Sequence, residues 1–432
     1  MDRIKQNALY LTLLQGMNYF LPLVTVVYLV RIFGPSDYGR LALSQAFIQF
    51  FVILVDYGFA LSATRLVAQH RDEPVRVASV FRAVILAKLL LAVSALPVML
   101  ALALWVPSLR PNILLCIAFY MSVLGNVFLP GWLYQGFQRM GVLLWITALP
   151  RIFATVAILL VVKRDDQLIA TAALLSAAPV VSGAAALAHC RRWLGLRPGR
   201  VAPHDVAEQF RAGWHVFLAT AAGAVYTLSP TFVLGLVAPS AAVGYFAAAE
   251  RLMRAAQNLL NPISQALYPY LARLFVDSRS DALRLLGRLL FLVLAGYGTL
   301  WLVCQIFPGE LLGLIFGKSF GQAVGVLRIL CLYPLISGIN VISGTLYLVP
   351  LNKGTTLSRS VTAPTAVHVV VIYPLALYFG SLGVASLLVI TEFLILGMRI
   401  RAARRTDAGD LKPLLLGFIH PFCKTPRTEI VR

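Results

Sequence analysis

The sequence has few charged residues. Only 12% of its 432 residues are Asp, Glu, Lys or Arg, while 59% are hydrophobic. Soluble domains carry about 25% charged residues. A single soluble core cannot absorb this excess of apolar side chains, so the composition predicts an integral membrane protein.

The sequence also lacks the patterns of common enzyme and metal sites. Its five cysteines are scattered, and its six histidines form no H-E-x-x-H motif. A phosphate-cradling glycine loop and a nucleophile elbow with triad partners are both missing. We therefore expect no metal, no cofactor and no enzymatic activity, and the sequence favours transport.

Acidic residues are scarce relative to basic ones, with 17 Asp and Glu against 37 Lys and Arg. In a soluble protein this excess would suggest nucleic acid, but in a membrane protein it belongs to cytoplasmic loops, so no nucleic acid partner is expected. If the N-terminus is cytoplasmic, most Lys and Arg fall on the cytoplasmic side. The sequence thus predicts a multi-pass membrane protein with both termini cytoplasmic. The basic segment from Arg399 onward is expected to be solvated.

Apolar runs long enough for a hydrocarbon core of about 30 Å predict about twelve transmembrane helices and an all-α fold. The linkers are too short to hold a soluble domain. The expected spans are 9–31, 41–62, 80–106, 113–135, 142–162, 167–189, 214–238, 242–272, 285–307, 320–348, 357–379 and 381–400.

The chain contains a weak internal repeat. LVRIFGPSDYGRLALSQAFIQF (29–50) and FVLGLVAPSAAVGYFAAAERLMRA (232–255) each contain a Pro-Ser turn, a glycine and then a new span. Six spans per half is an even number, so the halves are expected to insert the same way up as parallel repeats. The predicted division is an N-terminal half over 1–200, a C-terminal half over 201–400 and a basic cytoplasmic tail over 401–432.

Aligning Gly39 with Gly244 places matching polar residues in the second and eighth spans. Steps of 4, 7 and 11 residues stay on one helical face, so each half carries a polar stripe. The stripes are Gln45, Gln49 and Asp56 in one half and Glu250, Arg254, Gln257 and Asn261 in the other. Asn18 lies in the first span, and Asp56 has no countercharge nearby in the sequence before Arg65.

Ionisable residues inside spans indicate a polar interior. Each costs about 2.5–3.5 kcal/mol at the bilayer centre. Lys88 lies near a span end, where its amine can extend to water, but Arg151, Glu250, Arg251, Arg254 and Glu392 cannot do so easily. They are expected to face a water-filled cavity or one another.

Structural roles are the alternative for each of these residues. Glu250 and Arg254 can neutralise each other at i,i+4 spacing, and Asp56 can bond a neighbouring helix. Glu392 can pair with an arginine, Arg251 can point between helices, and Arg151 can bind carbonyl groups freed by Pro150. A cavity with surplus arginine nevertheless favours an anionic ligand, because guanidinium groups match phosphate oxygens.

Three stretches resemble a known family. They are NYFLPLVTVVYLVRIFGPSDYGRLALSQAFIQFFVILVDYGFALSATR (18–65), GYFAAAERLMRAAQNLLNPISQALYPYLAR (244–273) and FGKSFGQAVGVLRILCLYPLISG (316–338). They are similar to bacterial polysaccharide flippases, the O-antigen transporters of the multidrug/oligosaccharidyl-lipid/polysaccharide exporter superfamily. The resemblance implies two six-helix bundles around a central polar cavity. It also implies movement of undecaprenyl-diphosphate-linked oligosaccharide to the outer leaflet of the inner membrane.

On this hypothesis the polar residues divide into three groups. Arg151, Arg251 and Arg254 would bind the diphosphate, while Asn18, Gln45, Gln49, Gln257 and Asn261 would bind sugar hydroxyls. Asp56, Glu250 or Glu392 would couple transport to a proton or a sodium ion. Membrane lipid and the polysaccharide polymerase machinery are the other expected partners.

Two rival functions stay open. A drug/cation antiporter of the same superfamily would carry acids in its cavity without surplus arginine. An integral-membrane glycosyltransferase or polymerase would require a sizeable loop outside the membrane bearing catalytic groups.

Overall fold

The computed structural model describes residues 2–195, 201–406, 416, 418 and 419, and every element within them is helical. Two helices are much longer than the others, α1 (Asp2–Asp56) and α15 (Gly354–Thr406). Each consists of two helices joined at a glycine whose backbone is not helical. Gly34 has φ 66° and Gly380 has φ 55°. Glycine adopts a positive φ without the steric penalty of a side chain, which allows the chain to change direction there.

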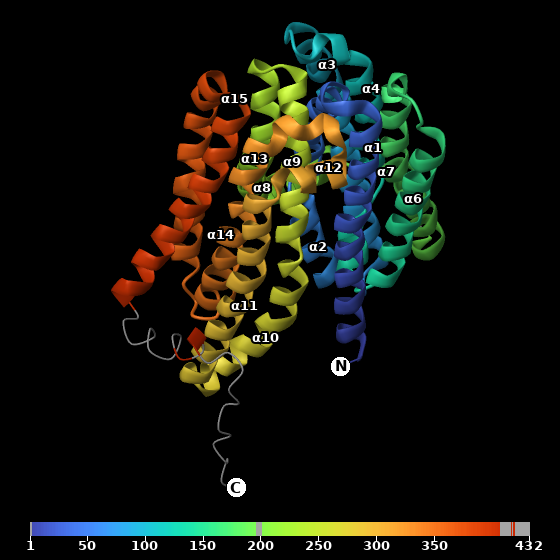
Figure 1. Ribbon diagram of the computed structural model, residues 1–432. Helices are drawn as coiled ribbons and strands as arrows, with labels where there is room; N and C mark the ends of the chain where they lie inside the picture. Colours follow the sequence, from blue (N-terminus) through green and yellow to red (C-terminus); the bar gives the residue numbers. More distant parts are fainter. Residues whose placement is uncertain (1, 196–200, 407–415, 417, 420–432) are drawn as a thin grey trace. The chain divides into compact units, whose positions relative to one another are not determined.

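The remaining α-helices are shorter (Figure 1). Among the described residues, four brief segments of other helix types adjoin some of them. The 3₁₀ segments are η1 (Arg110–Asn112), η2 (Asp165–Gln167) and η3 (Lys318–Ala323), and η4 (Ile342–Leu348) is a π-helix. The α-helices are α2 (Phe59–Gln69), α3 (Pro74–Trp105), α4 (Ile113–Val127), α5 (Gly131–Gly136), α6 (Met140–Val161), α7 (Leu168–Leu194), α8 (Pro203–Val237), α9 (Ser240–Asn258), α10 (Leu260–Asp277), α11 (Arg279–Ile306), α12 (Pro308–Phe316), α13 (Val324–Leu330) and α14 (Leu332–Val341).

The expected all-α membrane protein is confirmed. Within the described residues, nine helical stretches are long and apolar enough to cross a membrane. Two of the nine, Leu13–Gln69 and Gly354–Ala402, contain the breaks at Gly34 and Gly380. The consecutive helices α9 and α10 are not among them.

The chain folds into two compact units. The first is Met1–Ala248 with Ala376–Ser381, and the second is Ala249–Leu375 with Leu382–Arg432. The predicted halves, 1–200 and 201–400, stay a prediction. Most of the predicted tail, 401–432, lies outside the described residues.

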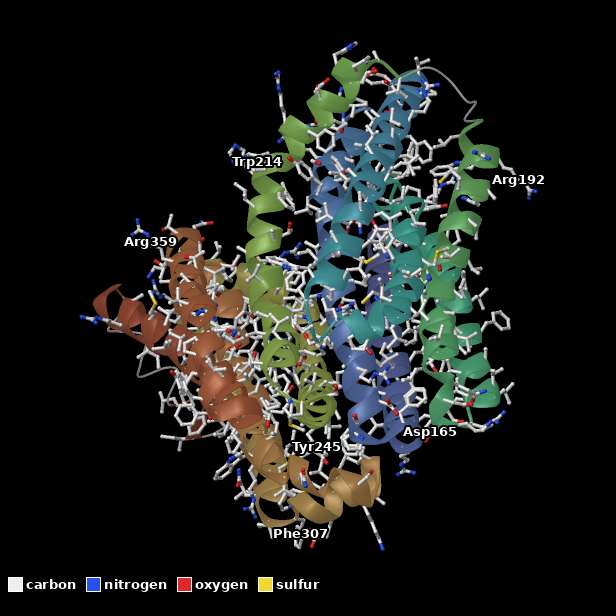
Figure 2. All side chains as sticks on the ribbon, turned by 90° about the horizontal axis from the view of Figure 1, so that it is seen from above. Asp165, Arg192, Trp214, Tyr245, Phe307 and Arg359 are labelled. Atoms are coloured by element: carbon white, nitrogen blue, oxygen red, sulfur yellow. The ribbon has the colours of Figure 1, made fainter. Side chains whose placement is uncertain are left out.

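In the first unit, α4 and α6 pack on α7, and α1 packs on α4, α6 and α8. A buried core of Phe59, Phe81, Trp132 and Tyr134, together with smaller apolar side chains, joins α2, α3 and α5. Figure 2 shows Arg192 and Trp214 toward one end of this unit and Asp165 and Tyr245 toward the other.

In the second unit, α11 packs on both α10 and α14. Leu271, Leu283, Leu286 and Leu346 form the centre of its buried core. The π-helix η4 follows α14 directly and also packs on α10 and α11. Inserted π turns are frequent at functional sites, which draws attention to the residues on either side of η4.

Candidate functional site

The second unit contains a buried ion pair on α9. Arg254 donates from Nε and Nη2 to the same oxygen of Glu250, Oε1, at 2.9 and 2.8 Å. The Glu250 side chain is 9% exposed and that of Arg254 is 22% exposed. The i,i+4 spacing places both side chains on one face of the helix, so the sequence pattern and the observed contact agree.

Tyr333 of α14 completes this cluster. Arg254 Nη1 lies 3.5 Å from the Tyr333 hydroxyl, and the guanidinium carbon lies 5.5 Å from the centre of the ring. Leu330, Leu388 and Met253 close around the same space, which is too narrow for a water molecule. In this structure that space is closed, although 22% of the Arg254 side chain is exposed, and the water-filled cavity expected from the sequence stays a prediction. An incoming anion would have to replace Glu250.

The polar stripe continues to Gln257 and then breaks. Gln257 Nε2 donates to Ser337 Oγ at 2.9 Å, one turn beyond Tyr333 on α14. The expected span over 242–272 is divided into two helices, because α9 ends at Asn258 and α10 begins at Leu260. Asn261 therefore lies on α10, where its Nδ2 donates to Asn258 Oδ1 at 3.1 Å.

Glu392 belongs to a second buried cluster in the same unit. Its carboxylate accepts from Asn340 Nδ2 at 2.7 Å, and its main-chain carbonyl accepts from the same amide at 2.9 Å. The main-chain carbonyl of Asn340 accepts in turn from Arg399 Nη1. Arg399 Nε donates to Ser360 Oγ at 3.1 Å. These bonds join α14 to both helices of α15.

Arg399 corrects the expectation that the chain is solvated from this residue onward. Its side chain is only 7% exposed and packs over Gly344, where a Cβ atom would lie 2.6 Å from Nη1. The sequence offers no signal for this burial, because Arg399 opens a run of arginines that resembles a cytoplasmic end. The sequence likewise gives no indication of the role of its partner Asn340.

His368 is another buried polar residue that the sequence pattern does not mark. It is fully buried, and Nδ1 lies 3.0 Å from Thr391 Oγ1. The Thr391 hydroxyl donates its proton to the Leu387 carbonyl. It can therefore only accept from the imidazole, which places the His368 proton on Nδ1.

In the first unit, Arg151 and Asn18 are brought together. Arg151 Nη1 of α6 donates to Asn18 Oδ1 of α1, and both side chains are partly buried. Thr25 and Thr155 lie 3.4 Å apart through their hydroxyl oxygens further along the same two helices. Two of the expected ligand-binding residues thus share one seam between α1 and α6.

The predicted stripe on the second half of α1 has unequal exposure. Gln45 is partly buried and Gln49 is exposed. The helix ends at Asp56, and Tyr57 and Gly58 follow with φ 43° and 73° before α2 begins. The expected continuous span over 41–62 is therefore interrupted at the residue that completes the stripe.

Asp56 does have a countercharge, which corrects the sequence-based interpretation. Lys88 Nζ of α3 lies 2.5 Å from Asp56 Oδ1. The lysine side chain is 3% exposed, so it does not reach water from a span end as expected, whereas Asp56 is 48% exposed. The two residues are far apart in sequence, so their pairing cannot be read from local spacing.

Arg251, next to Glu250 on α9, is partly buried.

Among the described residues, no group of three or more His, Cys, Asp or Glu side chains is placed to hold a metal ion. The structure thus provides two polar seams, Arg151–Asn18 in the first unit and Glu250–Arg254–Gln257 in the second.

The profile of the polysaccharide biosynthesis protein family matches residues 4–275. The chain belongs to this family. It is 30% identical over 403 residues to a protein of Escherichia coli (strain K12), covering 93% of this chain and 97% of the relative. It is 26% identical over 405 residues to a protein of Shigella dysenteriae, covering 93% of this chain and 100% of the relative. Both relatives carry the description "Putative O-antigen transporter".

Solved structures of MurJ and of a MATE transporter show that this polysaccharide biosynthesis family protein shares their fold. The lipid II flippase MurJ in an inward closed conformation aligns with a TM-score of 0.72 at 12% identity, covering 96% of this chain and 90% of that one. An inward-facing multidrug resistance MATE family transporter of the MOP superfamily aligns at 0.65 and 15% identity, covering 90% and 96%. The relatives are transporters rather than enzymes, as the sequence predicts.

Proposed function

We propose that this protein flips undecaprenyl-diphosphate-linked oligosaccharide, an O-antigen or exopolysaccharide repeat, from the inner to the outer leaflet of the bacterial inner membrane. The observation that carries the proposal is the Arg254 guanidinium held by Glu250 beside Tyr333 and the Gln257–Ser337 pair. A guanidinium group binds phosphate oxygens through paired N–H donors. Neighbouring amide and hydroxyl groups suit sugar hydroxyls.

The architecture that we propose has twelve helices in two parallel six-helix bundles around a central polar cavity. The breaks at Gly34 and Gly380 support this count, because each divides one long stretch into two helices. The helices α9 and α10 together supply one further crossing. Both termini are then cytoplasmic, in accordance with the distribution of Lys and Arg.

Alternating access follows from moving the two bundles about the cavity. Arg151, Arg251 and Arg254 bind the diphosphate; Asn18, Gln45, Gln49, Gln257 and Asn261 bind the sugars. The polyprenyl chain stays in lipid. Asp56, Glu250 and Glu392 are the candidates for proton or sodium coupling. The polymerase machinery receives the flipped substrate.

A flipping assay in vesicles tests the proposal. Purified protein is reconstituted with fluorescent undecaprenyl-diphosphate oligosaccharide, and appearance of the sugar in the opposite leaflet is followed with a membrane-impermeant quencher. Arg254→Ala is expected to abolish flipping, whereas Arg328→Ala, an exposed arginine of the same unit, keeps it. Wild-type flipping rates in the Arg254→Ala protein would contradict the role of the arginine.

The rival function, export of drugs or cations, uses the same fold as the MATE transporters. Expressing the protein in an efflux-deficient host and measuring drug resistance distinguishes this rival function from flipping. The surplus of arginine over acids in the spans disfavours cationic substrates, so we expect no increase in resistance.

A further inference from the structure

A cavity of about 200 Å³ lies in the first unit, and no residue of the two polar seams lines it. It is formed by the second helix of α1, the segment around η1 and the junction of α8 with α9. Its lining includes Arg40, Leu43, Ser108, Asn112, Gly235 and Val243. Tyr245, two residues beyond Val243, lies toward the same end of the unit as Asp165 in Figure 2. The charge distribution of the chain predicts that this end is periplasmic.

The polar wall of the cavity is held in place before any ligand binds. Arg40 Nε donates to Asn112 Oδ1 at 2.8 Å, and Nη1 donates to Asp37 Oδ1 at 3.0 Å. Asn112 is 3% exposed, and its own Nδ2 donates to the Ser108 carbonyl at 3.0 Å. A guanidinium fixed from two sides loses little conformational entropy on binding, which favours recognition.

The Ser108 hydroxyl supplies an independent sign of a ligand. Ser108 lines this cavity, and its hydroxyl oxygen is buried and has no hydrogen-bond partner among the residues that the structure describes. Leaving a buried hydroxyl unsatisfied costs about 1–3 kcal/mol, so such groups are rare in folded proteins. A ligand hydroxyl in the cavity would satisfy it.

The chemistry of the lining selects the class of ligand. Asp37 already neutralises Arg40, so the site does not attract an anion strongly. Fixed polar groups on one wall and apolar Leu43, Pro111 and Val243 on the other match the hydroxyl edge and the apolar face of a sugar ring. The volume is below the roughly 300–1,000 Å³ of pockets for drug-sized ligands, which restricts the occupant to about one ring.

We propose that this cavity is an exit-side subsite for one neutral sugar residue of the transported oligosaccharide. The proposal rests on the proposed function for the presence of that sugar. It adds a binding site separate from the diphosphate arginines. The subsite holds the sugar at the periplasmic end of the first unit before the oligosaccharide is released.

The test uses the full-length protein in detergent and a soluble probe. The probe is the oligosaccharide repeat of the host bacterium, released from its lipid diphosphate by mild acid, and binding is read by saturation-transfer difference NMR. Arg40→Gln and Ser108→Leu are expected to lose at least fivefold of the transfer signal. Arg110→Gln changes an exposed arginine two residues away and keeps the signal, as the matched control.

Ser108→Ala is a milder variant that removes only the hydroxyl and keeps the cavity open, so the protein is expected to fold normally. It is expected to weaken binding by a smaller factor than Ser108→Leu. The proposal is overturned if the wild-type protein gives no signal, if Arg40→Gln and Ser108→Leu bind like wild type, or if inorganic phosphate displaces the sugar. Arg254→Ala distinguishes the diphosphate assignment from the sugar subsite. This variant is expected to lose flipping but to retain binding of the soluble probe. Loss of probe binding in Arg40→Gln with continued flipping by Arg254→Ala would overturn the diphosphate assignment alone.

Discussion

Gly39 and Gly244, the residues that align the two sequence repeats, pack against each other's helices. A Cβ atom on Gly39 would overlap the carbonyl oxygen of Ser240 and lie 2.8 Å from the Gly244 nitrogen. A Cβ atom on Gly244 would overlap the carbonyl oxygen of Pro35. Each glycine thus contacts the Pro-Ser turn of the other repeat, which is the reciprocal contact expected when two equivalent elements meet around an approximate twofold axis. The two stretches that the sequence aligns thus meet through their matching glycines in the packing of α1 and α9.

This contact predicts that Gly39→Ala and Gly244→Ala are both destabilising. Overpacking of this kind costs about 1–3 kcal/mol, and the obstructing atoms here belong to main chain that cannot rotate away. We expect a lower melting temperature in detergent for either variant. Gly223→Ala on α8 is the control, since its Cβ atom would meet open space. Equal melting temperatures for all three variants and wild type would show that the two helices are not in contact.

Replacing Glu250 with Gln tests the competition between its carboxylate and the diphosphate. The substitution removes the negative charge that holds Arg254, so the affinity for undecaprenyl diphosphate is expected to rise about tenfold, equivalent to about 1.4 kcal/mol. Flipping is expected to slow, because the carboxylate no longer displaces the ligand from the arginine. Binding is measured with the fluorescent lipid and flipping with the vesicle assay. Glu310→Gln on α12 is the exposed control, and unchanged affinity in Glu250→Gln would show that the carboxylate does not compete.

The Asp56–Lys88 pair predicts an effect on stability. Asp56→Asn leaves a buried lysine without its carboxylate, which costs about 3–5 kcal/mol for a fully buried pair. Asp56 is half-exposed and water can solvate part of this charge, so we expect about 1–3 kcal/mol here. Thermal unfolding of the purified protein measures the loss. Asp56→Asn with Lys88→Met is expected to recover part of it, and failure to do so would show that the charges are not coupled.

The contacts of Arg399 predict that Lys is a poor substitute. Lysine has one nitrogen, whereas Arg399 uses Nε for Ser360 and Nη1 for the Asn340 carbonyl. Arg399→Lys is expected to lower stability by about 1–2 kcal/mol, as lost buried hydrogen bonds commonly do. Arg401→Lys is the matched control, because that side chain is exposed on the same helix. A melting temperature for Arg399→Lys equal to that of Arg401→Lys would contradict the structural role.

Some features of the site follow from local spacing and others do not. The Glu250–Arg254 contact is an i,i+4 pair, so the sequence predicts it directly. The pairings of Lys88 and Asn340 could not be predicted, because their partners Asp56 and Glu392 come from other helices. Hydrophobicity alone places Lys88 near a span end without indicating which way its side chain points.

The helix break after Asp56 escapes prediction for a different reason, because no proline marks it and the residues before it are mostly apolar. The break after Asn258 does have a local signal, since Pro262 cannot donate a main-chain hydrogen bond to the Asn258 carbonyl and its ring crowds that carbonyl. Gly58 lies close to Val216 and Phe217 of α8, which indicates that the break near Asp56 is tied to contact with a distant helix.

Composition alone predicts an all-helical membrane protein, because low charge and long apolar runs exclude a soluble core whatever the packing. Spacing along the chain is likewise enough to reveal the repeat and the i,i+4 pair. The packing of the helices was needed to show that Lys88 neutralises Asp56, that Arg399 is buried and that Arg254 lies beside Tyr333. Whether a side chain is buried, and which residue it pairs with, depend on which helices pack together. When the paired residues lie far apart in the chain, no periodic pattern in the sequence shows that their helices are neighbours.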